Sequence, residues 1–446
     1  MTDYAKGNLL AEGKTKKIWE IIGGNNGLVI IENKPDITAF DDPTFTKRVE
    51  SKAAYAPSTT CRVFELLKRT GIPVAYIEQI SATEFVAKKC SMIPLEAVAR
   101  RFAVGSYLKR NPNFEQPKGK PPARFHRLKT EFFLKTTKGT LHTASGAIVE
   151  GLDREKGEED PFILNPYNDS WDIYHSKKPI WDPAAKLREG ISAPRIMQSL
   201  NIKNTIKEIE GLLRDTFLVL EGMWASFGFH FIDLKIELGL DMTVIGGPLT
   251  VADVIDNDSW RLQDQNWQEL SKEAFRQGEK LDEVEKKYGI VANLLIGFRI
   301  PRQCLVLWRG SESDEFPKLS QSLNLRSISI ESITASGHKA PQRCLDILNE
   351  LEGKYPDGGI IVAKVGMSNG LGPMLAARTS WPVISIPATL NEHPEDIWSN
   401  TRIPSHVPMA VIASEGNATD FALKILAQKN PFLYWQLQKR IEELDE

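Results

Sequence analysis

From about residue 303 onward, the sequence alternates short apolar segments with helical segments, and this order strongly constrains the fold. The segments CLVLW, GGIIVAKVG and PVISIP are almost wholly apolar, which is typical of strands buried on both faces of a parallel sheet. Helical stretches such as FPKLSQSL and PQRCLDILNELEG lie between them. This alternation predicts a three-layer α/β/α domain with a doubly wound parallel sheet, whose ligand binds outside the carboxyl ends of the strands.

The preceding part of the chain has the pattern of a sheet-rich module with long helices. GLVIIEN and PVAYIEQI are expected to be strands, because their β-branched clusters are bounded by Gly, Asn or Pro. SKAAYAPSTTCRVFELLKRTG and IKNTIKEIEGLLRDTFLVLEGMWASFG are expected to be helices that end at Gly71 and Gly228. FHFIDLKIELGLD and LTVADVIDND are expected to be strands joined by a hairpin at IGGP. We expect loop at 111–122 and irregular backbone at 135–194.

Length and composition indicate a multidomain cytosolic protein. A chain of 446 residues is too long for one ordinary core, and we place domains at 1–265 and 303–446, joined by a helical linker at 266–302. The net charge of −2 gives no reason to expect nucleic acid or a membrane as a partner, and no apolar run approaches the roughly 20 residues of a membrane span. The N-terminus lacks a signal-peptide pattern, and the four cysteines form no C-x-x-C pair.

Three turns rich in small residues follow predicted strands of the second domain. They are RGSESDEF, TASGHKAP and VGMSNGLGP, and each sets hydroxyl or amide groups near a helix start, which suits a phosphate or another anion. One such turn alone is more often ordinary turn and cap chemistry, but three at the ends of parallel strands favour a ligand site. His338 stands in the second turn among small residues and beside Lys339.

Carboxylates concentrate on two predicted strands of the first domain. Strand alternation in FIDLKIELG places Asp233, Lys235 and Glu237 on one face. In VADVIDNDSWR, three further aspartates follow on the next strand and its exit: Asp253, Asp256 and Asp258. Carboxylates gathered in this way repel one another unless a cation lies between them. The alternative is an exposed acidic face balanced by lysines.

Two basic segments of the first domain are candidate anion sites. MIPLEAVARRFAVGSYLKRNP supplies five polar or cationic groups, namely Arg100, Arg101, Ser106, Lys109 and Arg110. They indicate a phosphate or carboxylate site, or else a basic helix with a turn. EGKTKKIWE places Gly13 before three lysines, but as a lone motif it is more often a solvated hairpin.

The second domain resembles AIR carboxylase, which acts on aminoimidazole ribonucleotide (AIR). GSESD, SGHK-P and SNGLGP, followed by PVISIPA, DIWSNTRIPS and ASEGNA, occur in the family's order. SNGLGP resembles the animal class, which takes CO2 directly, without ATP or biotin. The resemblance implies that His338 handles the proton leaving C4 of the imidazole, with Lys339 near the new carboxylate. It places AIR and CO2 at Gly310, Ser311, Ser313, Asp314, Ser336, Ser368, Asn369 and Gly370.

Three residues depart from the carboxylase pattern. Gly337 stands where the family usually has alanine, and Met367 stands where animal enzymes commonly have a basic residue. Arg309 is an additional cation before the GSESD turn. We expect these changes to tune phosphate affinity.

The first domain resembles SAICAR synthetase, which uses ATP to join L-aspartate to carboxyaminoimidazole ribonucleotide (CAIR). The matching segments are EGKTK, DITAF, MIPLEAVARRFAVGS, LKRNP, FFLK, IDLKIELG and ADVIDNDSWRL. The resemblance implies an ATP-grasp-like α+β fold with antiparallel sheets. It assigns ATP to Gly13, Lys14, Lys16 and Lys135, Mg2+ to Glu237 and Asp253, and CAIR to Arg100, Ser106 and Arg261. Lys235 is placed near the reacting carboxylate, and Asp160 in the ATP–aspartate region. The segment after FFLK is longer than in the animal enzymes, and Phe40 replaces a common glycine.

Together the two resemblances span nearly the whole chain, in the order of the bifunctional PAICS family of purine biosynthesis. They imply consecutive reactions, from AIR and CO2 to CAIR and from CAIR, ATP and aspartate to SAICAR. They also imply a homo-oligomer, an octamer assembled around the carboxylase domains. Two alternatives remain: a divergent paralogue with only the synthetase activity, and a noncatalytic nucleotide-binding scaffold.

Overall fold

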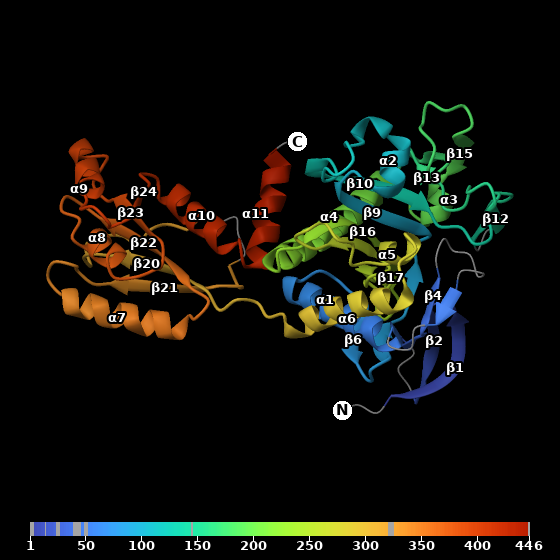
Figure 1. Ribbon diagram of the computed structural model, residues 1–446, viewed down its shortest axis with the longest axis horizontal. Coiled ribbons are helices and arrows are strands. Elements are labelled where there is room, and N and C mark those ends of the chain that lie inside the picture. Colours follow the sequence, from blue (N-terminus) through green and yellow to red (C-terminus); the bar gives the residue numbers. More distant parts are fainter. Residues whose placement is uncertain are drawn as a thin grey trace. The chain divides into compact units, whose positions relative to one another are not determined.

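The computed structural model describes residues 4–13, 15–23, 27–38, 46–48, 52–143, 146–319 and 325–444. The chain forms two compact units (Figure 1): Met1–Phe298 together with Glu442–Glu446, and Arg299–Ile441. The segment 266–302, expected as a linker, contains helices that pack within the first unit. In the ranges given above, no helix is long and apolar enough to cross a membrane.

The second unit contains a five-stranded parallel sheet in the order β21-β20-β22-β23-β24 (Figure 1). In chain order the strands are β20 (Cys304–Arg309), β21 (Ser329–Thr334), β22 (Gly359–Val365), β23 (Val383–Pro387) and β24 (Ala410–Val411). One face packs against α7 (Pro341–Lys354) and α8 (Leu371–Ala376), and the other against α10 (Glu415–Leu426) and α11 (Pro431–Leu444). The predicted three-layer, doubly wound fold is therefore confirmed.

Two local expectations for this unit need correction. FPKLSQSL was expected to be a helix, but Phe316–Leu319 is not helical, and the rest lies outside the described residues. The strand β21 was not among the predicted apolar segments, because SIESIT has two isoleucines among polar residues. It is an edge strand, so only part of its surface is buried, and a continuous apolar run is not required there.

The first unit is built on antiparallel sheets. A five-stranded sheet, β1-β2-β3-β7-β6, consists of Ala5–Glu12, Lys16–Ile22, Leu28–Asn33, Glu84–Lys88 and Tyr76–Gln79. A seven-stranded sheet, β15-β14-β13-β10-β9-β16-β19, consists of Lys186–Ser192, Ser170–Tyr174, Phe162–Ile163, Arg124–Leu134, Leu95–Phe102, His230–Ile236 and Trp260–Gln263. A three-stranded sheet, β18-β17-β8, consists of Leu249–Val251, Leu238–Asp241 and Cys90–Met92. Two small pairs are β4-β5 (Asp36–Thr38, Thr46–Arg48) and β11-β12 (Leu141–Thr143, Gly146–Val149).

The helices of this unit are α1 (Lys52–Thr70), α2 (Gly105–Arg110), α3 (Ala193–Met197), α4 (Ile202–Ser226), α5 (Glu273–Arg276) and α6 (Leu281–Gly297). The two long predicted helices are thus confirmed. The chain turns after them at Gly71 and Gly228, whose positive φ values of 89° and 78° suit glycine. α4 packs on β16 and β9 through fully buried side chains such as Phe217 and Trp224.

The two strands predicted around IGGP are shorter than expected. FHFIDLKIELGLD divides at Glu237 into β16 and β17, which belong to different sheets. In LTVADVIDND only Leu249–Val251 is a strand, so the three aspartates that follow lie in a loop. The segment 135–194 also contains β11 to β15 and is not wholly irregular, whereas 111–122 holds only one short 3-10 turn, Pro112–Phe114.

Candidate active sites

A cluster of lysines and carboxylates forms where β9, β10 and β16 run side by side. Lys235 Nζ lies 2.7 Å from Glu96 Oε1 and 3.1 Å from Glu237 Oε1. Lys135, directly after β10, forms an ion pair with Glu237, and its Nζ lies 3.8 Å from Glu96 Oε1. The two lysines therefore share the same two carboxylates.

The hairpin that joins β1 and β2 brings a third lysine to this cluster. The N–H of Gly13 donates to the carbonyl of Lys16 over 2.9 Å, which closes the EGKTK turn, and Lys14 lies outside the described residues. Lys16 forms an ion pair with Asp253. The loop that carries Asp253 is held beside Glu237, because the Ala252 N–H donates to the Glu237 carbonyl over 3.1 Å.

Burial and neighbouring charges set the protonation of this cluster. Burial and the positive charges of nearby lysines lower the pKa of Lys16 to about 8, against the attraction of Glu237. Burial also disfavours the charged form of Lys235, but Glu96 and Glu237 outweigh it and raise the pKa of that lysine. Glu237 is buried, yet Lys235 and Lys135 hold the pKa of its carboxyl below the ordinary value. The cluster therefore sets three lysines, Lys16, Lys135 and Lys235, against three carboxylates, and the lysines are suited to bind phosphates and carboxylates.

The acidic cluster expected from the sequence is only partly assembled. Glu237 and Asp253 both lie among the lysines, but Asp233 does not, because it pairs with arginines. Within the part of the chain that the structure describes, no group of three or more His, Cys, Asp or Glu could hold a metal ion. Two carboxylates still fit Mg2+, which is often bound through one or two carboxylates plus substrate phosphates.

An arginine cluster lies further along the same strands. Arg100 on β9 donates to Glu131 over 2.7 Å and to Ser106 Oγ over 3.1 Å, and it pairs with Asp233. Arg261 on β19 donates to the same Asp233 carboxylate over 2.5 Å. The start of α2 approaches this guanidinium closely: a Cβ at residue 105 would lie 2.7 Å from Arg261 Nη2, and φ there is 57°. The sequence-predicted Arg100, Ser106 and Arg261 are thus brought together.

Two other basic residues of this segment, Arg101 and Arg110, have structural roles, whereas Lys109 is exposed. Arg101 follows Arg100 on β9 and points to the opposite face, where it is fully buried and pairs with Glu221 and Glu442. Arg110 is buried between Phe133 and Phe162 and pairs with Glu131. The alternative of one basic helix is wrong, because the two adjacent arginines lie on a strand.

Sequence analysis missed Glu96 and Glu131 as members of these clusters. Glu96 lies on β9 four residues before Arg100, and strand alternation puts both on one face, so the signal was present. Glu131 lies on β10, and its role depends on pairing between distant strands. Asp160 was assigned from the resemblance. Its Oδ1 accepts the N–H of Thr136, the residue after Lys135, over 2.8 Å.

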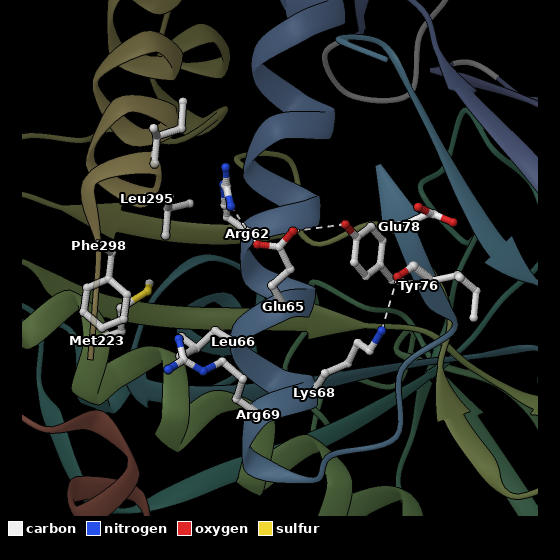
Figure 2. Close-up of a pocket in the computed structure, with 12 residues that line it drawn as sticks. Arg62, Glu65, Leu66, Lys68, Arg69, Tyr76, Glu78, Met223, Leu295 and Phe298 are labelled. Carbon is white, nitrogen blue, oxygen red and sulfur yellow. Dashed lines mark hydrogen bonds and ion pairs between the residues drawn. The ribbon is translucent and has the colours of Figure 1, made fainter. Parts of the chain in front are cut away.

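A cavity of about 480 Å³ opens elsewhere in the first unit, between α1, β6 and the ends of α4 and α6 (Figure 2). In its lining, Arg62 and the Tyr76 hydroxyl donate to Glu65, and Lys68 donates to the Ile77 carbonyl. None of the sequence-predicted site residues lines it. The lysine and arginine clusters, which contain the residues predicted from the sequence, are therefore the candidates for the site of chemistry in this unit.

In the second unit, the turn after β21 meets the turn after β22. The His338 ring lies against Gly370, where an added Cβ would stand 2.3 Å from His338 Nε2. At Gly337 a Cβ would stand 2.7 Å from both the Gly370 carbonyl oxygen and Leu371 Cα. The glycine that departs from the family pattern is therefore required by this close backbone approach. His338 itself is exposed and accessible to a ligand.

The turn after β20 is shaped by its preceding arginine. Arg309 donates to Thr334 Oγ1 over 2.8 Å and to the Asp314 carbonyl over 2.7 Å, and it stacks on Phe316. Within the turn, Ser311 Oγ and Ser313 Oγ lie 2.9 Å apart and are exposed, and Gly310 and Asp314 complete it. Arg309 thus supports the predicted ligand turn through backbone and ring contacts.

The remaining predicted residues of this unit lie in the other two turns. Ser336 Oγ accepts the Lys339 N–H over 3.2 Å and so closes the turn before α7, while the Lys339 side chain is exposed. Ser368 is exposed, and Asn369 Oδ1 accepts the Gly372 N–H at the start of α8 over 2.9 Å. All three turns lie at the carboxyl ends of parallel strands, as the fold class requires for a ligand site.

Comparisons with known proteins agree with this division. The family model of SAICAR synthetase matches residues 9–145 and 172–293, and that of AIR carboxylase matches 305–446. A probable multifunctional protein ADE2 from Caenorhabditis elegans is 32% identical over 440 residues, covering 96% of this chain and 91% of that protein. The chain belongs to the bifunctional SAICAR synthetase/AIR carboxylase family, PAICS.

Other relatives of the family cover the whole chain or its first part. The human bifunctional phosphoribosylaminoimidazole carboxylase/phosphoribosylaminoimidazole succinocarboxamide synthetase is 31% identical over 450 residues, covering 98% of this chain and 93% of that protein. A solved phosphoribosylaminoimidazole-succinocarboxamide synthase from Ehrlichia chaffeensis is 21% identical with a TM-score of 0.48, covering 66% of this chain and all of that one. Both PAICS domains are present, because the two family models match residues in both units.

Proposed function

We propose that the protein catalyses two consecutive steps of purine biosynthesis. The second unit carboxylates AIR with CO2 to give CAIR, and the first unit joins CAIR to L-aspartate with ATP to give SAICAR, ADP and phosphate. The observation that carries this proposal is the pairing, in one chain, of a histidine-bearing turn on Gly370 with a lysine cluster beside an arginine cluster.

In the carboxylase unit, the residues present suit a proton transfer at carbon. C4 of an aminoimidazole is enamine-like, and its electron pair forms a bond to the carbon of CO2. The tetrahedral carbon then loses its proton to the imidazole of His338, and the ring becomes aromatic again. Lys339 lies next in sequence and balances the new carboxylate, while the serine turns hold the ribose phosphate. Neither ATP nor biotin takes part.

In the synthetase unit, the CAIR carboxylate oxygen attacks the γ-phosphorus of ATP and ADP leaves. The amine of aspartate then attacks the acyl phosphate, and phosphate leaves as the amide forms. Lys16, Lys135 and Lys235 neutralise the negative charge along this path. Gly13 and Lys14 of the EGKTK motif are the further ATP-binding residues. Arg100, Ser106 and Arg261 hold the CAIR phosphate and carboxylate, and Asp160 lies toward aspartate.

Glu237 and Asp253 are the residues that would hold Mg2+, which supplies Lewis-acid stabilisation of the transferred phosphoryl group when bound. We further propose that the protein is cytosolic and forms a homo-octamer through its carboxylase units, and that nucleic acids and membranes are not partners. The synthetase-only paralogue is disfavoured, because relatives across the whole chain are bifunctional and His338 is retained. The scaffold is disfavoured because the catalytic positions Lys14, Glu237, Asp253 and His338 are all present in the sequence.

The test supplies purified protein with AIR and bicarbonate, without ATP, and follows CAIR formation. We expect CAIR from the wild type and none from His338→Asn, while both make SAICAR from supplied CAIR, ATP and aspartate. No CAIR from the wild type, with SAICAR still formed, would leave the synthetase-only paralogue. ATP binding without either product would favour the scaffold.

A further inference from the structure

A buried carboxylate links the turns that follow β22 and β23. Asp396 Oδ1 accepts the Met367 N–H over 2.8 Å and Ser399 Oγ over 2.7 Å. Its Oδ2 accepts the N–H of Thr389 over 3.2 Å and the hydroxyl of the same residue over 2.8 Å. Asp396 is 2% exposed, and an ionised carboxylate, which only accepts, matches this set of donors.

The hydrogen bonds keep Asp396 charged despite its burial. Burial by itself raises the pKa of the carboxyl, but the bonds from Ser399, Thr389 and Met367 bring it below the ordinary value. This residue belongs to the DIWSN motif, which the reaction steps above leave without a role.

The hydrogen bond from the Met367 N–H to Asp396 lies on strained backbone. Met367 has φ 58°, in the left-handed region that non-glycine residues rarely adopt. Its side chain is 56% exposed, so packing of that side chain does little to hold the conformation. A second hydrogen bond connects the same two turns two residues further on: Asn369 Nδ2 donates to Asn400 Oδ1 in α9 (Ile397–Thr401) over 2.7 Å.

The turn that contains Met367 ends beside the candidate catalytic histidine, His338. Gly370, at its end, lies against the His338 ring, and Ser368 and Asn369 are candidate AIR-binding residues. A shift of this turn would move the wall behind the imidazole and the AIR contacts together. A misplacement of about 1 Å in a catalytic or binding group, even one caused by a change away from the reacting atoms, can lower the rate roughly 100-fold.

We propose that Asp396 is a positioning residue for the carboxylase reaction. Its charged carboxylate holds Met367 in the left-handed conformation, and with it the turn that runs to Gly370. It thereby fixes the surface against which His338 accepts the proton. The inference rests on the proposed carboxylase function, because it acts through that function's histidine.

The test measures CAIR formation from AIR and bicarbonate by the full-length chain with Asp396→Asn, alone and combined with Met367→Gly. We expect kcat/KM to fall roughly 10–100-fold in Asp396→Asn. Glycine adopts a positive φ without the hydrogen bond from Asp396. The fold loss in kcat/KM caused by Asp396→Asn should therefore be at least about tenfold smaller in the Met367→Gly background. An equal loss in both backgrounds, or no loss, would overturn the proposal.

Two controls separate positioning from general damage. Ser399→Ala removes another hydrogen bond to the same Oδ1 but leaves the one from the Met367 N–H, and we expect kcat/KM within about threefold of wild type. A loss there as large as in Asp396→Asn would count against the proposal. SAICAR synthesis from supplied CAIR should stay unchanged in every variant.

Two further outcomes are distinguishable. If Asp396→Asn does not fold, Asp396→Glu keeps the charge but displaces the carboxylate, and the same comparison in the Met367→Gly background applies. If wild-type protein makes no CAIR, the proposed carboxylase function itself fails, and this inference fails with it. Wild-type CAIR formation with no coupling between residues 396 and 367 would overturn only the positioning role.

Discussion

Gly337 lies where the turn that carries His338 meets the backbone of the neighbouring turn. We expect Gly337→Ala, which restores the residue common in the family, to lower CAIR formation at least about tenfold, because its Cβ would lie 2.7 Å from backbone atoms of Gly370 and Leu371. Steady-state rates with AIR and bicarbonate give the measurement. Gly353→Ala in α7 is the matched control, since a Cβ there meets nothing within 4 Å and should stabilise the helix by roughly 0.5–1 kcal/mol. Unchanged CAIR formation in Gly337→Ala would contradict the packing argument.

Glu96 is the carboxylate that stays with Lys235 if Glu237 binds a cation. We expect Glu96→Gln to lower the kcat of SAICAR formation about tenfold, because Lys235 and Lys135 then lose the charge that holds them in place. The assay uses saturating CAIR, ATP and aspartate. CAIR formation by the other unit should not change, and a Glu96→Gln enzyme with wild-type kcat would rule out this role.

Residue patterns predicted which residues of the first unit lie near one another better than they predicted how these residues pair. Strand alternation placed Lys235 and Glu237 correctly, and the same rule applied to β9 would have added Glu96. It could not show that Asp233 serves Arg100 and Arg261, because that depends on the pairing of β16 with β9 and β19. The roles carried over from the families remain predictions.

At the scale of elements, the sequence predicts strands well where burial is uniform and poorly where a strand changes sheet. The continuous pattern of FHFIDLKIELGLD contains no signal for the break at Glu237, since both halves are buried. The break arises because β16 pairs with β9 while β17 pairs with β8. Glu237, the residue at the break, is a member of the lysine cluster, so the local irregularity lies at the candidate site.

A partly buried ion pair joins the strand β22 and the helix α10. Lys364 Nζ lies 2.9 Å from Glu415 Oε1, and Glu415 Oε2 accepts the Lys318 N–H over 2.9 Å. We expect Glu415→Gln to lower the free energy of unfolding of this unit by about 1–3 kcal/mol, because it leaves the Lys364 charge buried without its partner. Adding Lys364→Met should recover much of the loss, since replacing both partners of a buried pair is often near neutral. Thermal unfolding followed by residual CAIR-forming activity measures both effects.

The same pair has a defined pH dependence. Burial raises the pKa of Glu415, but Lys364 and the Lys318 amide outweigh it and bring the pKa below the ordinary value. A carboxyl with a lowered folded pKa contributes stability above its unfolded pKa, about 4.3, and loses it as the pH falls. The difference between wild type and Glu415→Gln should therefore be constant near neutral pH and shrink below about pH 4. A difference that grows on acidification would contradict this assignment.

At the scale of the whole molecule, local pattern predicted the class of each unit but not the contacts that close it. The parallel sheet of the second unit follows from three apolar segments, because only a strand covered on both faces has that composition. By contrast, Glu442 belongs to the first unit, where its carboxylate accepts a hydrogen bond from Arg101, 341 residues earlier in the chain. No periodicity or motif relates residues so distant in sequence.

Glu442 completes a buried charge network in the first unit. Its Oε1 accepts from Arg101 Nη2 over 2.8 Å and its Oε2 from Arg214 Nη1 over 3.1 Å, while Glu221 pairs with the other side of the Arg101 guanidinium. We expect Glu442→Gln to destabilise the first unit by about 1–3 kcal/mol, because a fully buried arginine keeps only one of its two carboxylates.

The measurement heats the full-length protein and follows residual SAICAR synthesis from supplied CAIR. Glu443→Gln is the matched control, because it removes the same charge from the next residue, whose side chain is exposed. It should change the free energy of unfolding by less than about 0.5 kcal/mol. A lower inactivation midpoint for Glu442→Gln alone would assign the effect to the buried network. Equal midpoints for the two variants would mean that Glu221 alone satisfies Arg101, and that the last turn of α11 adds no stability to the synthetase unit.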